Sequence, residues 1–177
     1  SVPTPMVELG ANLLVNPDFE APILVDGVSG WAVHSRHVAG VFSAQGQDGQ
    51  AYCSQQNLGE SEAVGWVGFA QDVVMAPDTL YLLKGELLYE NAVQLHVLVE
   101  WRSNDQQVGR EILYNVGGIP PDGITAGAWM PFEVMFRSPG GIDEGRIHIW
   151  HGVINNQTNV PGGQFCADNF WLSTVIE

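Results

Sequence analysis

The sequence contains few basic residues: six Lys and Arg stand against twenty Asp and Glu, so its 177 residues carry a net charge of −14. A surface of that sign repels nucleic-acid phosphates and anionic lipid headgroups. Long hydrophobic runs are also lacking, and none approaches the roughly 20 residues of a membrane-spanning helix. These two absences exclude nucleic acid and membrane from the expected partners.

Helix signals are nearly absent as well, because no window of about 12 residues shows convincing 3.6-residue periodicity. The chain is nevertheless 45% hydrophobic and 15% charged, which argues against disorder. Its 21 Gly and 10 Pro are scattered between short apolar runs, as in proteins made of many strands joined by turns. We therefore predict an all-β fold, a two-sheet β-sandwich of the jelly-roll type. The expected strands are 70–75, 81–89, 94–102, 110–116, 132–137, 146–151 and 164–173.

The chain length suits one domain, which we place at residues 12–177 after a Pro-broken leader at residues 1–11. There are only two cysteines, Cys53 and Cys166, which cannot form a zinc site alone. Both lie in strand-like segments, so they form a disulfide if those strands are neighbours, and otherwise are two buried thiols. The acidic, Lys-poor, Gly- and Trp-rich composition predicts a secreted module.

Alternation assigns faces to several of the predicted strands. In 94–102 the apolar set that should face the core is Leu95, Val97, Val99 and Trp101. The other strands contribute the predicted inward residues Tyr81, Leu83, Leu87, Tyr89, Phe132, Val134, Phe136, Ile147 and Ile149. Planar and bidentate side chains then point to solvent, namely His96, Arg102, Arg137, His148 and Trp150.

Such an outward face is typical of a sugar-binding surface, because aromatic rings stack on pyranose faces and charged groups bind hydroxyls or carboxylates. Four of the six basic residues fall on it if its strands share one sheet: Lys84, Arg102, Arg137 and Arg146. That cluster favours a carboxylated chain, whereas the net charge argues against one. Ordinary cross-strand ion pairs with Glu86, Glu100 and Glu133 are the alternative explanation.

Motifs at both ends of the chain show a family resemblance. Residues 12–20 read Asn-Leu-Leu-Val-Asn-Pro-Asp-Phe-Glu, Gly30-Trp31 follows, and residues 165–172 read Phe-Cys-Ala-Asp-Asn-Phe-Trp-Leu. This ordered set resembles carbohydrate-binding modules of the family 4, 9, 16 and 22 group over residues 12–174. The resemblance implies a jelly roll that binds one polysaccharide chain in a cleft on its concave sheet, carries a structural Ca²⁺ and belongs to a larger enzyme.

The resemblance also implies site residues. The calcium ligands would be the carboxylates of Glu20, Asp48 and Asp168, with backbone carbonyls near Asp18 and Ala51. Asp168-Asn169 departs from the commoner Asp-Asp, but the usual ligand position is kept. For the sugar it implies Trp66 with Gln71 as a polar neighbour, and His148, with Tyr114 as a candidate second ring. Trp31, Trp129 and Trp171 are expected in the core. Together with the outward face, the predicted ligand-binding set is Trp66, Gln71, His96, Glu100, Arg102, Tyr114, Arg146, His148 and Trp150.

The predicted function is a non-catalytic, monomeric module that binds a β-glucan, xylan or similar polysaccharide and is tethered to a catalytic domain. One alternative is a jelly-roll polysaccharide lyase or glycosidase. It would use the carboxylates of Glu86, Glu100 and Glu133, or His96 or His148 with Tyr114 and Arg102. A structural or adhesion sandwich is the other alternative.

Overall fold

The computed structural model describes residues 8–21, 30–35, 40–55, 65–92, 94–117, 123–153 and 163–176. Every regular element in these ranges is a strand, so the predicted all-β class is confirmed. The strands are β1 (Glu8–Leu9), β2 (Ala32–Ser35), β3 (Gly40–Gln45), β4 (Gln50–Gln55), β5 (Gly65–Val74), β6 (Leu80–Glu90), β7 (Leu95–Ser103), β8 (Gln106–Val116), β9 (Met130–Arg137), β10 (Glu144–Val153) and β11 (Gln164–Ile176).

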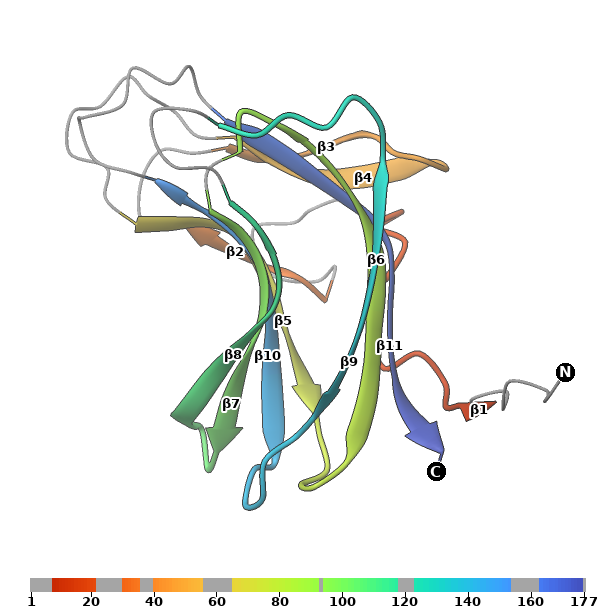
Figure 1. Cartoon of the computed structure of the whole chain (residues 1–177), viewed down its shortest axis with the longest axis vertical. Coiled ribbons are helices and arrows are strands. Elements are labelled where there is room, and N and C mark those ends of the chain that lie inside the picture. Colours follow the sequence, from red (N-terminus) through yellow and green to blue (C-terminus); the bar gives the residue numbers. More distant parts are fainter. Residues whose placement is uncertain are drawn as a thin grey trace, which may run out of the picture.

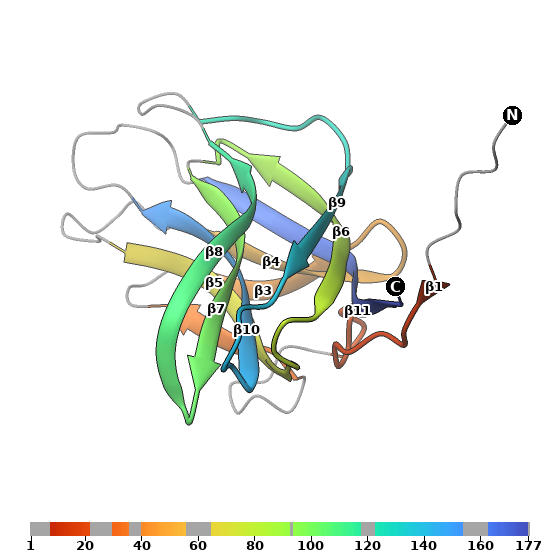
Figure 2. The same ribbon diagram turned by 60° about the horizontal axis from the view of Figure 1, so that its bottom comes forward.

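Antiparallel pairing joins the strands into two sheets that face each other (Figures 1 and 2). The six-stranded sheet has the order β3-β4-β11-β6-β9, with β1 paired to the end of β11. The five-stranded sheet has the order β2-β5-β10-β7-β8. Neighbours in each sheet are mostly distant in sequence, which is the pattern of a sandwich with long connections. The predicted two-sheet β-sandwich is confirmed.

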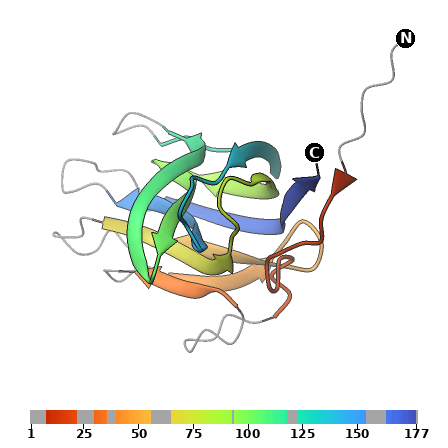
Figure 3. The same ribbon diagram turned by 90° about the horizontal axis from the view of Figure 1, so that it is seen from below.

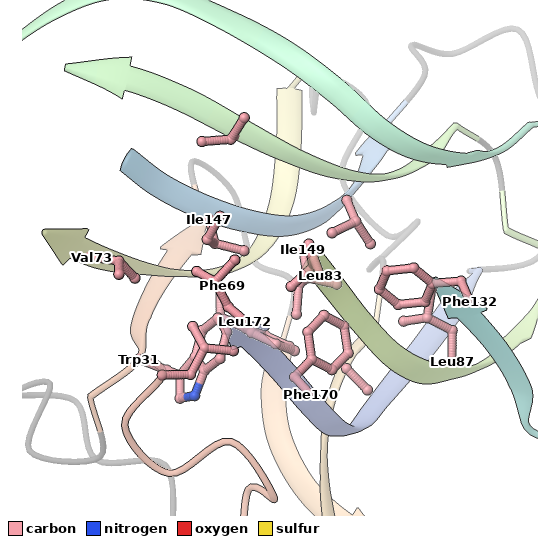
Figure 4. Close-up of a cluster of buried hydrophobic side chains, with 14 of the residues drawn as sticks. Trp31, Phe69, Val73, Leu83, Leu87, Phe132, Ile147, Ile149, Phe170 and Leu172 are labelled. Atoms are coloured by element: carbon pink, nitrogen blue, oxygen red, sulfur yellow. The ribbon is translucent and has the colours of Figure 1, made fainter. Parts of the chain in front are cut away.

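The core lies between the two sheets and consists of the inward side chains of both (Figure 4). All the residues that alternation places inward pack in it or against it, and Trp101 is only 5% exposed. Burying each large apolar side chain contributes about 1.5–3 kcal/mol. Because inward and outward residues alternate, the same strands must present their remaining side chains on the two outer faces.

The N-terminal motif closes one side of this core. The Asn12 side chain bridges to β11: its Oδ1 accepts from the Leu172 N–H (3.0 Å) and its Nδ2 donates to the Phe170 carbonyl (3.1 Å). Phe19 is fully buried and contacts the rings of Trp31, Tyr52 and Phe170 among others. The motif therefore covers one side of the core. The predicted core position of Trp31 is confirmed.

Strand pairing places two further features of the sequence. Glu8 and Leu9, expected in the leader, pair with Ile176 and Val175 at the end of β11, as the view from below shows (Figure 3). Cys53 and Cys166 lie directly opposite each other on β4 and β11 and form a disulfide. The sequence left a disulfide and two buried thiols as alternatives, and the structure contains the disulfide.

Candidate functional site

The outer face of the five-stranded sheet carries most of the predicted sugar-binding side chains. Strands β7 and β8 bow toward the six-stranded sheet, so this outer face is concave (Figure 1). Register places Trp150 beside His96 in one row across the sheet, and His148 beside Ala70 in the next. A third row joins residues of β5, β10 and β7, namely Asp72, Arg146 and Glu100.

Four rings form an aromatic cluster on this face. The Trp66 ring stacks on Trp150 with centroids 5.2 Å apart and lies 4.8 Å from His96. The His148 ring lies 4.4 Å from Trp150. Trp66 reaches across β10 because its register partner is Gly152, where a Cβ would lie only 3.4 Å from the indole. Three strands thus contribute to one aromatic cluster.

Ion pairs lie beside the aromatic cluster. Arg146 binds both carboxylate oxygens of Asp72, at 2.5 and 2.9 Å. Arg102 pairs with Glu100 at 2.8 Å and with Glu144 at 2.9 Å. The hydrogen bond from Arg146 holds the pKa of Asp72 below its usual range, and the same bond raises the pKa of Arg146. Both arginines are thus compensated within the face, Arg146 by one carboxylate in bidentate geometry and Arg102 by two different carboxylates.

A hollow of about 300 Å³ opens next to the Asp72–Arg146 pair. Its small side chains, Ala32 and Ala70, lie opposite each other on β2 and β5 and leave room above the sheet. The His148 ring contributes a wall, and its Nε2 is 3.5 Å from the Glu100 carboxylate. The hollow is lined by Gly30, Ala32, Val33, Ala70, Asp72, Arg146 and His148.

The exposure of the rings differs from the prediction. His148 and Trp150 lie on the outer face as expected, but only 3% and 8% of their surface is exposed. Trp66 stacks over Trp150 and is itself half-buried, as is His96. Burial lowers the pKa of His96, and the nearby charge of Arg110 lowers it further. Trp66 and a neutral His96 therefore offer the accessible ring surface, while Trp150 supports them from below.

Two predicted sugar ligands do not lie on this face. Gln71 alternates with Ala70 and Asp72, so it points inward, where its amide bonds both the N–H and the carbonyl of Val15. Tyr114 is also on the inner side. A bulge in β8 shifts the register between the Leu98–Ile112 and Val97–Tyr114 pairs, so Tyr114 faces the same way as Val97. Its ring stacks on Phe132 at 4.8 Å. Both assignments were wrong.

The predicted basic cluster is divided between the two sheets. Lys84 lies on β6 and Arg137 on β9, in the six-stranded sheet, whereas Arg102 and Arg146 lie in the five-stranded sheet. The carboxylates of the enzyme alternatives are divided in the same way, with Glu86 and Glu133 on one sheet and Glu100 on the other. Tyr114 faces the core, so neither proposed catalytic set converges at one point.

Four features of this face were not predicted from the sequence: Asp72 and Glu144, which complete the ion pairs, and Ala32 and Ala70, which line the hollow. A signal for Asp72 was present, because it shares the parity of Trp66 on one strand. Applying the two-residue period from Trp66 onward leads through Gly68 and Ala70 to Asp72. Ala32 carried no comparable signal, since its place depends on the pairing of β2 with β5.

Two of the predicted calcium ligands meet at the turn before β4. The buried Asp168 accepts hydrogen bonds from the N–H groups of Gln47 (2.8 Å) and Asp48 (3.3 Å). Glu20 accepts from the Gln50 N–H at 2.8 Å. Gly49 has φ +76°, and a Cβ there would overlap the Glu20 carboxylate. The turn thus holds two carboxylates that come from distant parts of the chain.

The donor set at this turn is only partly that of a metal site. Within the ranges that the structure describes, no group of three or more His, Cys, Asp or Glu side chains is arranged to hold a metal ion. Asp48 is exposed and contributes its N–H to Asp168, and the backbone hydrogen bonds already occupy that carboxylate. Burial raises the pKa of Asp168, although the backbone N–H groups oppose the shift. Two carboxylates would need main-chain oxygens, such as those near Asp18 and Ala51, to complete a Ca²⁺ shell.

No protein-family model and no curated protein matches the chain. Solved structures do. The family 16 carbohydrate-binding module-2 is 20% identical at a TM-score of 0.57, covering 94% of this chain and 100% of that one. The CBM22-1 xylan-binding domain of Paenibacillus barcinonensis Xyn10C is 16% identical at a TM-score of 0.60, covering 94% and 97%.

The enzymatically active domain of bacteriophage CBA120 tailspike protein 4 is also similar, with 14% identity and a TM-score of 0.64. The match covers 92% of this chain but only 21% of the tailspike chain, so this chain spans about a fifth of that protein. At these identities the likeness concerns the fold. The fold of the chain is that of the carbohydrate-binding-module jelly rolls, as the terminal motifs predict.

Proposed function

We propose that the chain is a non-catalytic carbohydrate-binding module that holds a polysaccharide on the concave face of its five-stranded sheet. The observation that carries the proposal is the aromatic surface of Trp66 and His96 beside a hollow with a bidentate Asp72–Arg146 pair. Rings stack on the apolar faces of pyranoses, and paired charged groups bind their hydroxyls. The jelly-roll fold shared with saccharide-binding modules supports this reading.

The ligand that fits this face best is a neutral β-linked chain, such as a β-glucan or a xylan. Arg102 and Arg146 are both paired with carboxylates of the same face, so they do not favour a carboxylated chain. The net charge of −14 disfavours one further. Binding to a neutral chain should depend little on salt, because screening acts on charge–charge attraction.

A wider biological setting is part of the proposal. One similar structure is a CBM22-1 module joined to a GH10 module and complexed with xylohexaose, which supports a module tethered to a catalytic domain. Secretion is proposed from the acidic, Lys-poor composition alone. We also propose a structural Ca²⁺ between Glu20 and Asp168, remote from the sugar-binding face. Carboxylates of distant segments gain stability when an ion bridges them.

Affinity electrophoresis against xylan, β-glucans, mannans and alginate tests the proposed function. We expect retardation by at least one neutral β-glycan, and at least a tenfold loss of affinity in Trp66→Ala, because that substitution removes the accessible indole. No retardation by any polymer would contradict the proposal and favour the structural or adhesion alternative. Release of reducing ends or of unsaturated products would instead favour an enzyme.

The Asp72–Arg146 pair gives a second test at the same site. Asp72→Ala removes a hydroxyl acceptor and leaves Arg146 without its partner, so affinity for the retained glycan should fall about tenfold. Stability should change by less than about 1 kcal/mol, since the pair is partly exposed. Isothermal titration and urea unfolding measure the two effects. The matched control is Val74→Ala, the next outward residue on β5, which does not line the hollow and should bind normally.

A further inference from the structure

The outer face of the six-stranded sheet contains a second and larger hollow, of about 470 Å³. It lies on the opposite side of the sandwich from the concave face, and its walls come from β6, β9 and β11. The lining residues are Lys84, Gly85, Glu86, Pro131, Phe132, Glu133 and Asn169. None of them belongs to the site proposed above.

A bulge in β11 shapes this hollow. The register between β11 and β6 shifts between Asp168 and Trp171, and Asn169 adopts a positive φ of 53°. The bulge turns the Asn169 side chain outward, where its Nδ2 donates to the Glu86 carboxylate at 2.9 Å. Bulges commonly re-aim a side chain beside a functional site. Here one positions an amide–carboxylate pair at the rim of the hollow.

The rim combines hydrogen-bond donors and acceptors with little net charge. Lys84 supplies an ammonium group, Glu86 and Glu133 supply carboxylates, and Asn169 supplies an amide. Glu133 lies directly opposite Lys84 in the β6–β9 register. The exposed Pro131 supplies an apolar side chain, whereas Gly85 and Phe132 point inward from their strands. A polyhydroxylated neutral ligand suits such a site, because its hydroxyls both donate and accept while its C–H face contacts Pro131.

Two tryptophans that were predicted to lie in the core are on this outer face instead. Trp171 is half-buried on β11, with the Lys84 Nζ 5.8 Å from its ring centroid. Trp129 is half-buried just before β9 and packs with Leu88 and the disulfide. Along β6, Lys84 and Leu88 are separated by about 13 Å at roughly 3.3 Å per residue. The hollow therefore lies on the part of the sheet between the two tryptophans, although neither indole lines it.

From these observations we infer that the outer face of the six-stranded sheet is a second saccharide-binding site. Its ligand class is a neutral pyranoside unit, held by Glu86, Glu133, Lys84 and Asn169 between Trp129 and Trp171. The two sites lie on opposite faces of a rigid sandwich, so one sugar chain cannot occupy both without wrapping around the molecule. The module would then bridge two polysaccharide chains and gain avidity on dense polymer surfaces.

Titration of the protein with β-1,4-linked xylohexaose and cellohexaose tests this inference. We expect two binding events in the unmodified protein, and a residual single event in Trp66→Ala. In the double variant Lys84→Ala/Glu133→Ala, the affinity of the event that remains in Trp66→Ala should fall at least tenfold. Met135→Ala is the matched control, because Met135 is exposed on β9 near Glu133 but does not line the hollow. Changes in the NMR chemical shifts of the Glu86 and Asn169 amides during the oligosaccharide titration give a measurement that is independent of the variants.

The possible outcomes separate this inference from the proposed function. A single event that disappears in Trp66→Ala would overturn the second site and leave the proposed function intact. A single event that survives in Trp66→Ala but is lost in Lys84→Ala/Glu133→Ala would support the second site and overturn the concave-face site. Failure of the unmodified protein to bind any oligosaccharide would overturn both.

Discussion

His151 is a titratable side chain placed in the core rather than in either site. It points inward from β10, is fully buried, and contacts the edge of Phe165 with ring centroids 5.0 Å apart. Its Nε2 lies 3.2 Å from the Ser54 hydroxyl. Burial lowers the pKa of His151 from 6.5 to about 3, because the charged imidazolium loses its hydration. The residue therefore stays neutral in the folded protein across most of the acidic range.

This burial predicts a pH-dependent stability. Above pH 6.5 His151 is neutral in both states, so it adds no pH dependence. As the pH falls from 6.5 toward 3, the unfolded chain takes up a proton that the folded protein does not, and the free energy of unfolding decreases. At about 1.4 kcal/mol per pH unit, the loss should reach about 2–3 kcal/mol at pH 4.5.

Urea unfolding of the protein and of His151→Gln between pH 7.5 and 4.5 measures the effect. The Gln variant keeps a polar group near Ser54 but does not titrate, so its stability should fall less steeply with acid. If the free energy of unfolding falls equally steeply with pH in the two proteins, His151 is not responsible for the pH dependence.

The N-terminal segment and β11 form the element-scale unit that the terminal motifs describe. Asn12 bonds the backbone of β11, and Asn16 bonds Tyr52 through its Nδ2 at 2.9 Å. The Trp31 indole N–H donates to the Asn16 carbonyl at 3.1 Å. Motif residues that look like a binding signature therefore satisfy backbone and side-chain groups at the edge of the core. Their role in the described structure is to attach the first segment to the last strand.

This attachment predicts a large effect of a small substitution. Asn12→Ala removes the acceptor for the N–H groups of Leu14 and Leu172 and the donor to the Phe170 carbonyl. Leaving these groups without partners should cost about 2–4 kcal/mol of unfolding free energy. Asn12→Asp keeps the acceptor oxygen and should lose clearly less. Thermal or urea unfolding compares the two, and equal losses would refute the bridging role.

At the scale of the whole molecule, the proposed Ca²⁺ would join the N-terminal segment, the turn before β4 and β11 through Glu20 and Asp168. An ion at a hundred times its dissociation constant stabilises the folded state by about 3 kcal/mol. Chelation with EDTA should therefore lower the melting temperature by several degrees. Sugar affinity measured below the melt should not change, because the concave face is built by other strands.

Matched variants make the chelation experiment specific. Glu20→Ala should abolish the sensitivity of the melting temperature to EDTA, whereas Glu111→Ala, an exposed acidic residue on β8, should keep it. A melting curve unchanged by chelation would refute the ion. The turn would then be held by the backbone hydrogen bonds of Glu20 and Asp168 alone.

The sequence alone determined the class of fold and the faces of individual strands. Inward residues such as Val97, Ile147 and Phe136 were predicted correctly, because the two-residue period of a strand is a local property of the backbone. The same rule put His96, His148 and Trp150 on the outer face of their strands. The terminal motifs predicted the jelly-roll fold for a related reason, since they encode local turns and contacts with β11.

Only the tertiary structure decided which strands share a sheet and which side chains stay accessible. Strand pairing depends on contacts between distant segments. The predicted basic cluster does not form, because Lys84 and Arg102 lie on different sheets. A single bulge in β8 sent Tyr114 into the core, because one extra residue reverses every side chain beyond it. Stacking by Trp66 covered Trp150, and pairing of β4 with β11 joined the two cysteines. Such facts arise from packing, which no local pattern contains.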